Sequence, residues 1–174
     1  TYYKGASIVH NLRAYLGDEL FRSGMQSVLA ELYDSYMDAA QFEATLEEVT
    51  GVDMTPWFEA QVLQPGFSTW VLDSAVTTGA QQSMLYLQQK LRACDNYHMS
   101  EPLDVAVWDA NWNRYDTEIV ASGQYDEVVI DHPGIDQPAL IALNPNGRLN
   151  QGRMDFMYTI DDTEGIQNLP WVQM

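Results

Sequence analysis

The chain has 174 residues, 46% of them apolar, which is enough to bury one core or two small ones. Its 25 acidic and 8 basic residues give a formal charge of −17, which disfavours nucleic-acid binding because phosphate contacts need clustered lysine and arginine. Cys94 is the single cysteine and no apolar run approaches the ~20 residues that span a bilayer, which argues against an internal disulfide and a membrane span.

The N-terminus does not look like the start of a complete protein. Thr1 stands where an initiator methionine is expected, and the residues after it lack the features of a signal peptide. We therefore expect the chain to be a piece of something longer.

The first helix predicted from the sequence carries an apolar stripe and ends at Gly17. Asp18 is placed to cap a second helix with the same period. If the chain is cut from a larger domain, the stripe of the first helix would lack its partner. We then expect an exposed apolar face and self-association through it, with the stripe formed by Ile8, Val9, Leu12 and Leu16.

Two further helices are predicted before residue 64. Asp38 and Gln41 have the spacing of a capping box, and Gly51 is placed to end the helix that follows. Thr55 is read as the cap of a last short helix, with Pro56 at its first position. Four helices joined by short loops indicate a small helical unit.

Beyond the break at residues 64–68, the apolar period changes from about 3.6 to 2. Short strands separated by turn residues, with no helices between them, are typical of an antiparallel β-sandwich. The strands are predicted at residues 70–77, 83–91, 103–108, 128–130, 139–143 and 154–160. The expected fold is therefore α+β, with a helical domain at residues 1–66 and a β-sandwich domain at residues 67–174.

The sequence contains no recognisable zinc-binding motif. The H-E-x-x-H pattern is absent, and His10, His98 and His132 lie far apart in unlike contexts. Glu101 follows His98 at helical spacing, but Pro102 comes next, so we interpret His98 as an incidental loop residue. We predict no metal or cofactor bound by this chain.

Other chemistry is also weakly supported. The segment that begins at Asp109 starts like a calcium loop, but Arg114 occupies the glycine position and Val120 the position of the bidentate glutamate. Cys94 lacks a histidine that the local sequence would hold beside it, so a thiol nucleophile is not predicted.

One set of short motifs resembles a known family. The segment Tyr2-Tyr3-Lys4-Gly5-Ala6, followed by Leu16-Gly17-Asp18-Glu19-Leu20-Phe21, resembles the Y-x-K-G-A and L-G-x-x-x-F run of the aminopeptidase N family of zinc metallopeptidases, which are gluzincins. The likeness extends to about residue 72 and includes Gln64-Pro65-Gly66-Phe67, although Ser68 stands where the family usually has proline. The glycyl-aminopeptidase family, which also has a tyrosine before a lysine-glycine pair, is the nearest competitor.

The resemblance implies that residues 1–66 are the helical tail of a thermolysin-like catalytic domain. Tyr2 matches the family tyrosine whose hydroxyl stabilises the oxyanion of the tetrahedral intermediate, and Tyr3 falls on a variable position. The zinc ligands and the general base of the family precede this tyrosine, so zinc and peptide substrates are expected only for a full-length parent. Alone, the chain is expected to be inactive and to need the rest of the catalytic domain as its partner.

Two alternatives remain open at the level of sequence. The chain could serve as a non-catalytic docking module, or it could come from a degenerate pseudo-peptidase that has lost its metal ligands. The upstream gene sequence would separate these possibilities, because it either contains H-E-x-x-H or does not.

Overall fold

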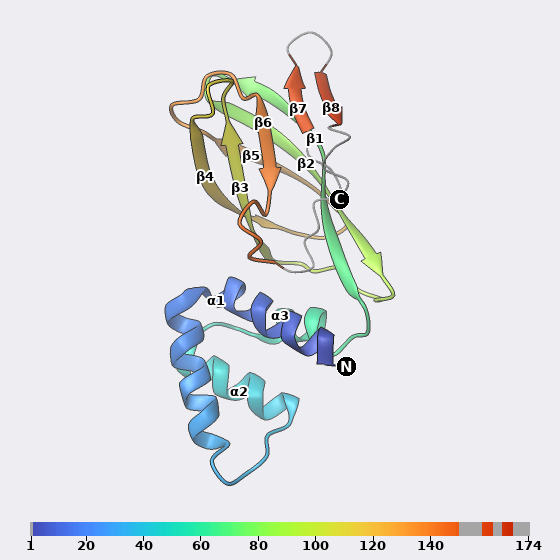
Figure 1. Cartoon of the computed structure of the whole chain (residues 1–174). Helices are drawn as coiled ribbons and strands as arrows, with labels where there is room; N and C mark the ends of the chain where they lie inside the picture. The colour runs from blue at the N-terminus through green and yellow to red at the C-terminus, as the bar shows by residue number, and fades with distance from the viewer. Residues whose placement is uncertain (1, 150–157, 162–164, 169–174) are drawn as a thin grey trace.

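The computed structural model describes residues 2–149, 158–161 and 165–168, with side chains described for residues 4–149. In this part of the chain three helices come first and eight strands follow, which confirms an α+β fold (Figure 1). The helices are α1 (Tyr2–Glu31), α2 (Ala39–Thr50) and α3 (Thr55–Gln61). None of them combines the length and apolar character that a membrane crossing needs.

The helix α1 is bent at Gly17. This residue has φ 75° and ψ 165°, outside the helical region and in a conformation that glycine adopts at little cost. The predicted break at Gly17 is therefore present, but the two helices expected on either side run on without a loop as the two halves of α1.

The capping box of α2 is formed as predicted. The Asp38 carboxylate accepts a hydrogen bond from Gln41 N at 2.8 Å, and the Gln41 side chain accepts one from Asp38 N at 3.0 Å. Gly51 ends the helix in the left-handed conformation, and its N–H donates to Glu47 O. Both ends of α2 are thus determined by local chemistry.

The predicted cap of α3 is wrong. Met54 occupies the cap position, no side chain caps the helix, and Thr55 is already its first helical residue. The N–H of Thr55 donates to the Asp53 carboxylate at 3.0 Å. That bond satisfies an unpaired donor of the helix start, so Thr55 itself does not need to cap.

The expected exposed stripe on α1 is also wrong. Leu12 is fully buried and Leu16 is 7% exposed, because they pack in one core with residues of α2 and α3; Val9, at 42%, stays exposed. The helices share one core formed by Leu12, Leu16, Val28, Leu46, Met54, Trp57 and Phe58. The observed packing therefore does not support self-association through this stripe.

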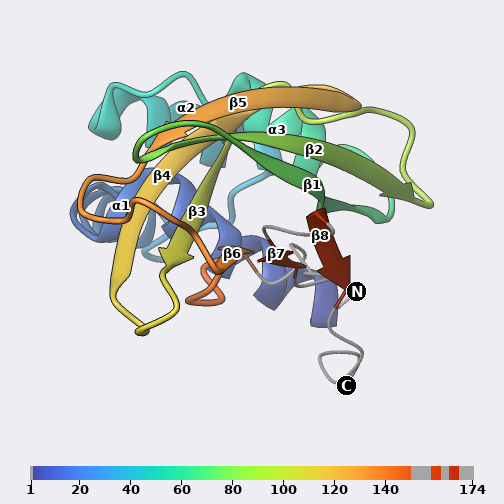
Figure 2. The same ribbon diagram turned by 90° about the horizontal axis from the view of Figure 1, so that it is seen from above.

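The strands form two antiparallel sheets. Their bounds are β1 (Phe67–Gly79), β2 (Gln82–Arg92), β3 (Glu101–Trp108), β4 (Arg114–Ala121), β5 (Tyr125–Asp131), β6 (Leu140–Leu143), β7 (Tyr158–Asp161) and β8 (Gly165–Asn168). One sheet has the order β1-β2-β5 and the other β4-β3-β6-β7-β8, and Figure 2 shows them as two layers. Strands β4 and β8 were not predicted, and residues 154–157 of the last predicted strand lie outside the described residues.

A single apolar core lies between the two sheets. It draws on β1, β2 and β5 from one sheet and on β3, β4 and β6 from the other, and it includes Ala14 of α1. All four residues of β6 are buried. Because α1 contributes to both cores, the helices are fixed against one end of the sheets (Figure 1).

The turn between α3 and β1 depends on Gly66. Its φ is +68°, and a Cβ added there would come within 2.1 Å of the main-chain oxygen of Arg92 and 2.3 Å of that of Ala93. Ala93 itself has φ 56°, an uncommon conformation for a residue with a side chain. Two backbone segments meet here with no room for a side chain.

We expect Gly66→Ala to lower the free energy of unfolding by about 3 kcal/mol or more, since it combines a left-handed backbone with a clash against main-chain atoms. The matched control is Gly51→Ala, which has φ +69° but open space around a Cβ, and should cost about 1 kcal/mol. Urea denaturation of both variants measures the difference. Equal losses would show that the close approach at Gly66 is unimportant.

Candidate functional site

The start of α1 carries the only residue for which the sequence predicts a catalytic role. Tyr2 lies in the first turn of the helix, and the side chains of Tyr2 and Tyr3 are outside the described ones, so the role of Tyr2 stays a prediction. Lys4 follows in the same turn, and its Nζ donates a hydrogen bond to the main-chain oxygen of Gln64 at 2.6 Å. Two motifs 60 residues apart are thereby joined.

The side chain of Gln64 is held at four points. It is 8% exposed, and its Nε2 donates to Ala60 O at 2.7 Å and to Asn96 O at 3.2 Å. Its Oε1 accepts from Asp95 N at 3.2 Å and from Asn96 N at 3.0 Å. An amide has two N–H donors and two lone pairs on its oxygen, so its capacity is fully used. Gln64 thus ties the end of the helices to the loop after β2.

That loop continues into a buried ion pair. His98 Nδ1 contacts Glu101 Oε2, and the side chains are 5% and 3% exposed. The Gln89 side chain accepts from His98 N at 2.8 Å. His98 lies in a loop as expected, but it is buried against Glu101 and is therefore not incidental to the structure. The spacing of His98 and Glu101 was visible in the sequence, but their burial was not.

The ion pair lies close to the helices. Burial raises the pKa of the Tyr15 phenol, and the negative charges of Glu101 and Asp53 raise it further. The second oxygen of Glu101, Oε1, is buried and has no hydrogen-bond partner among the described residues. A buried carboxylate oxygen without a partner is costly, which makes the pair sensitive to substitution.

Replacing Glu101 with leucine should leave His98 buried without its partner and lower stability by about 3–5 kcal/mol. The double variant His98→Leu/Glu101→Leu should lose less than the sum of the two single variants, because neither charge remains alone. Thermal unfolding of the four proteins completes the cycle. Additive losses would show that the two side chains do not interact.

A second buried histidine, His132, contacts the side chain of Ser83. Ser83 Oγ lies 2.9 Å from His132 Nε2, and His132 Nδ1 lies 2.8 Å from Ile135 O. Because a carbonyl only accepts, Nδ1 carries the proton, and Nε2 accepts from the Ser83 hydroxyl. Both residues are 0% exposed, so no substrate reaches them. This Ser–His contact is structural.

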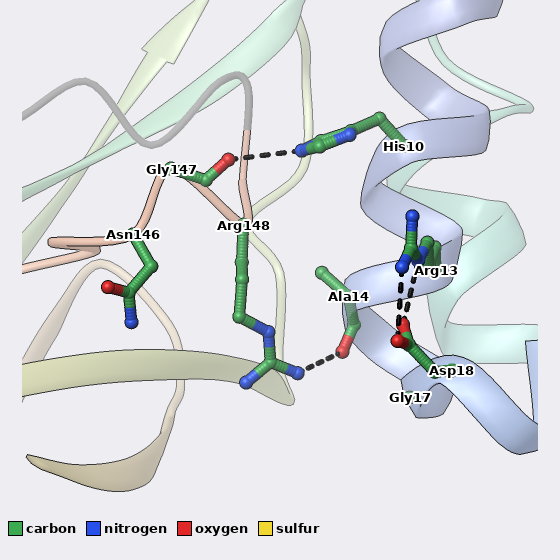
Figure 3. Close-up of a pocket in the computed structure, with 8 residues that line it drawn as sticks. All are labelled: His10, Arg13, Ala14, Gly17, Asp18, Asn146, Gly147 and Arg148. Atoms are coloured by element: carbon green, nitrogen blue, oxygen red, sulfur yellow. Dashed lines mark hydrogen bonds and ion pairs between the residues drawn. The ribbon is translucent and has the colours of Figure 1, made fainter.

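A pocket of about 440 Å³ lies between α1 and the turn after β6 (Figure 3). Arg148 donates to Ala14 O at 2.9 Å from one nitrogen and pairs from another with Asp104 at 2.5 Å and Glu118 at 2.9 Å. Burial lowers the pKa of Arg148, but the two carboxylates raise it overall. His10 of α1 has its Nε2 3.0 Å from the main-chain oxygen of Gly147.

The charges in this pocket are internally compensated. Arg13 donates to both carboxylate oxygens of Asp18, at 2.7 and 3.0 Å (Figure 3). Arg148 pairs with Asp104 and Glu118. No cation in the pocket is left without an acidic partner to attract an anionic ligand. We therefore interpret the pocket as a structural contact region between α1 and the turn after β6.

The described residues do not fit a metal centre. They contain no group of three or more His, Cys, Asp or Glu side chains placed to hold a metal ion. In the segment that begins like a calcium loop, the Asp109 carboxylate accepts from Asn111 N, Asn113 N and Asn113 Nδ2 within its own turn. The Cys94 thiol is buried and donates to Phe67 O at 3.1 Å.

Comparison with known proteins places the fold. No protein-family model matches the chain. A leucyl aminopeptidase of Saccharolobus solfataricus is 33% identical over 67 residues, which are 38% of this chain and 8% of that protein. The crystal structure of Legionella pneumophila aminopeptidase A in complex with aspartic acid superimposes with a TM-score of 0.66 and 13% identity, over 81% of this chain and 16% of that one.

Both likenesses are to parts of larger aminopeptidases. The chain has the fold of one part of a much larger aminopeptidase, and it shares sequence with a short stretch of another. It spans less than a fifth of the length of either. The similarity supports an aminopeptidase origin, while the activity of a whole protein has to be proposed.

Proposed function

We propose that this chain is part of a zinc aminopeptidase of the aminopeptidase N family, which removes N-terminal residues from peptides. In this proposal residues 1–66 are the helical end of a thermolysin-like catalytic domain. Residues 67–174 are the β-sandwich domain that follows it. Alone, the chain is inactive.

The observation that carries the proposal is the hydrogen bond from Lys4 to Gln64 O. The family resemblance rests on several short motifs, and two of them, Tyr2-x-Lys4-Gly5 and Gln64-Pro65-Gly66, are far apart in sequence. A chance resemblance gives no reason for them to touch. Their contact is expected if both belong to one inherited architecture, and it agrees with the two aminopeptidase likenesses.

The role of Tyr2 follows from the chemistry of peptide hydrolysis. Attack on the scissile carbonyl converts its oxygen into an oxyanion, and a neutral phenol with a pKa near 10 can donate a hydrogen bond to it. Such a donor acts mainly in the transition state, because the ground-state carbonyl carries less charge. We assign this donation to the Tyr2 hydroxyl and none to Tyr3.

Zinc belongs to the proposed parent and not to these residues. A catalytic zinc needs three protein ligands and an open position, and the described residues offer no such group. In this proposal its ligands come from a region of the parent that precedes Tyr2. The metal would polarise the substrate carbonyl there.

In the parent enzyme, Tyr2→Phe should lower kcat by about 10²–10³ while KM changes much less, since only a transition-state interaction is lost. Tyr3→Phe is the matched control and should stay within a few-fold of wild type. Steady-state kinetics on an aminoacyl reporter substrate measures both. If the two variants behave alike, or if Tyr2→Phe raises KM alone, the assignment of Tyr2 is wrong.

The isolated 174-residue chain should retain no stoichiometric zinc after dialysis and should not cleave aminoacyl reporters. Elemental analysis together with a hydrolysis assay tests this. One tightly held zinc per chain would contradict the proposal that the metal ligands lie elsewhere in the parent.

A further inference from the structure

We infer that Lys4 is a positioning residue for the catalytic step: it anchors the first turn of α1 to Gln64 and thereby holds the Tyr2 position in place. This inference rests on the proposed role of Tyr2 and adds a residue that acts through it. Its basis is the way the start of α1 is attached to the rest of the chain.

The start of a helix is its least constrained part. The first four N–H groups have no partner within the helix, and terminal turns fray easily. The first turn of α1 contains no acidic side chain that would stabilise it. A catalytic residue placed there needs an external attachment, and Lys4 supplies one through its hydrogen bond of 2.6 Å to Gln64 O.

The acceptor of this bond is itself fixed. The four hydrogen bonds of the Gln64 side chain hold the residue against Ala60, Asp95 and Asn96. Gly66, two residues on, lies against the main chain of Arg92 without space for a Cβ. The Gln64 carbonyl that accepts from Lys4 therefore belongs to a rigid region of the chain. A hydrogen bond to it restrains the first turn of α1, which carries Lys4.

Lys4 does not share a face of the helix with Tyr2. Each residue turns an α-helix by about 100°, so positions 2 and 4 lie about 200° apart around the axis. Lys4 thus holds the helix from the side opposite position 2, and its ammonium group is occupied by Gln64. It acts on the reaction through the backbone of α1 and not by touching the substrate.

The consequence for catalysis is geometric. A donor to the oxyanion must lie within hydrogen-bond distance of a charge that exists only in the transition state, and a misplacement of about 1 Å can cost on the order of 10²-fold in rate. Releasing the first turn of α1 should therefore lower kcat through Tyr2, with little effect on substrate binding.

The test is a double-mutant cycle in the full-length parent, with Lys4→Met, Tyr2→Phe and the double variant. Methionine has a similar length and no donor. Lys4→Met should lower kcat by about 10–100-fold with KM within threefold and zinc content unchanged. In the Tyr2→Phe background the same change should cost less than threefold, because the donor that Lys4 positions is already gone.

Two further variants sharpen the cycle. Lys90→Met makes the same change at the other lysine of the chain, on β2, and should leave kcat within threefold of wild type. Lys4→Arg keeps a positive donor and should retain more activity than Lys4→Met. If Lys4→Met does not fold, the cycle is run with Lys4→Arg, whose smaller loss should again vanish in the Tyr2→Phe background.

Losses that multiply in the double variant, or a Lys4→Met enzyme within threefold of wild type, overturn the inference and leave the role of Tyr2 standing. A Tyr2→Phe enzyme with normal kcat overturns the proposed role of Tyr2, and the positioning role of Lys4 with it. The two failures are therefore distinguishable from the single-variant data.

Discussion

The side chain of Gln64 is the constraint on which the arrangement of helices and sheets depends. A buried polar group left without a partner costs about 1–3 kcal/mol, so the four hydrogen bonds of the Gln64 amide each stabilise this arrangement. They join the end of α3 to the loop that leaves β2. The chain can then turn into β1 only through Gly66, where no side chain fits.

The helices have one core and the two sheets share another. The contacts around Gln64 help explain how these two parts behave as one body. Three attachments bridge them at two positions of α1: Lys4 donates to Gln64 O near its start, and Ala14 near its middle lies in the core of the sheets and accepts from Arg148. A helix held at both its start and its middle cannot pivot. Any group on its first turn therefore keeps a defined position relative to the sheets.

The two buried histidines show why a side chain's surroundings decide its chemistry. His132 Nδ1 lies 2.8 Å from the main-chain oxygen of Ile135, and its Nε2 lies 2.9 Å from Ser83 Oγ. His98 instead faces a carboxylate, and its loop is fastened by Gln89. Both are sealed from solvent, so each contributes to structure. Neither arrangement supplies an accessible nucleophile.

Local chemistry was enough to predict the α+β class, the capping box at Asp38, an interruption at Gly17 and the change of period near residue 66. The capping box and the interruption each depend on residues within a turn of one another. The sequence also pointed to Tyr2, but only through a family resemblance. The strand β4 escaped prediction because its exposed polar residues mask the alternation, and the burial of His98, Glu101 and the stripe on α1 depends on segments far along the chain. Tertiary structure alone decided that Lys4 meets Gln64, since a hydrogen bond across 60 residues leaves no periodic trace in a sequence.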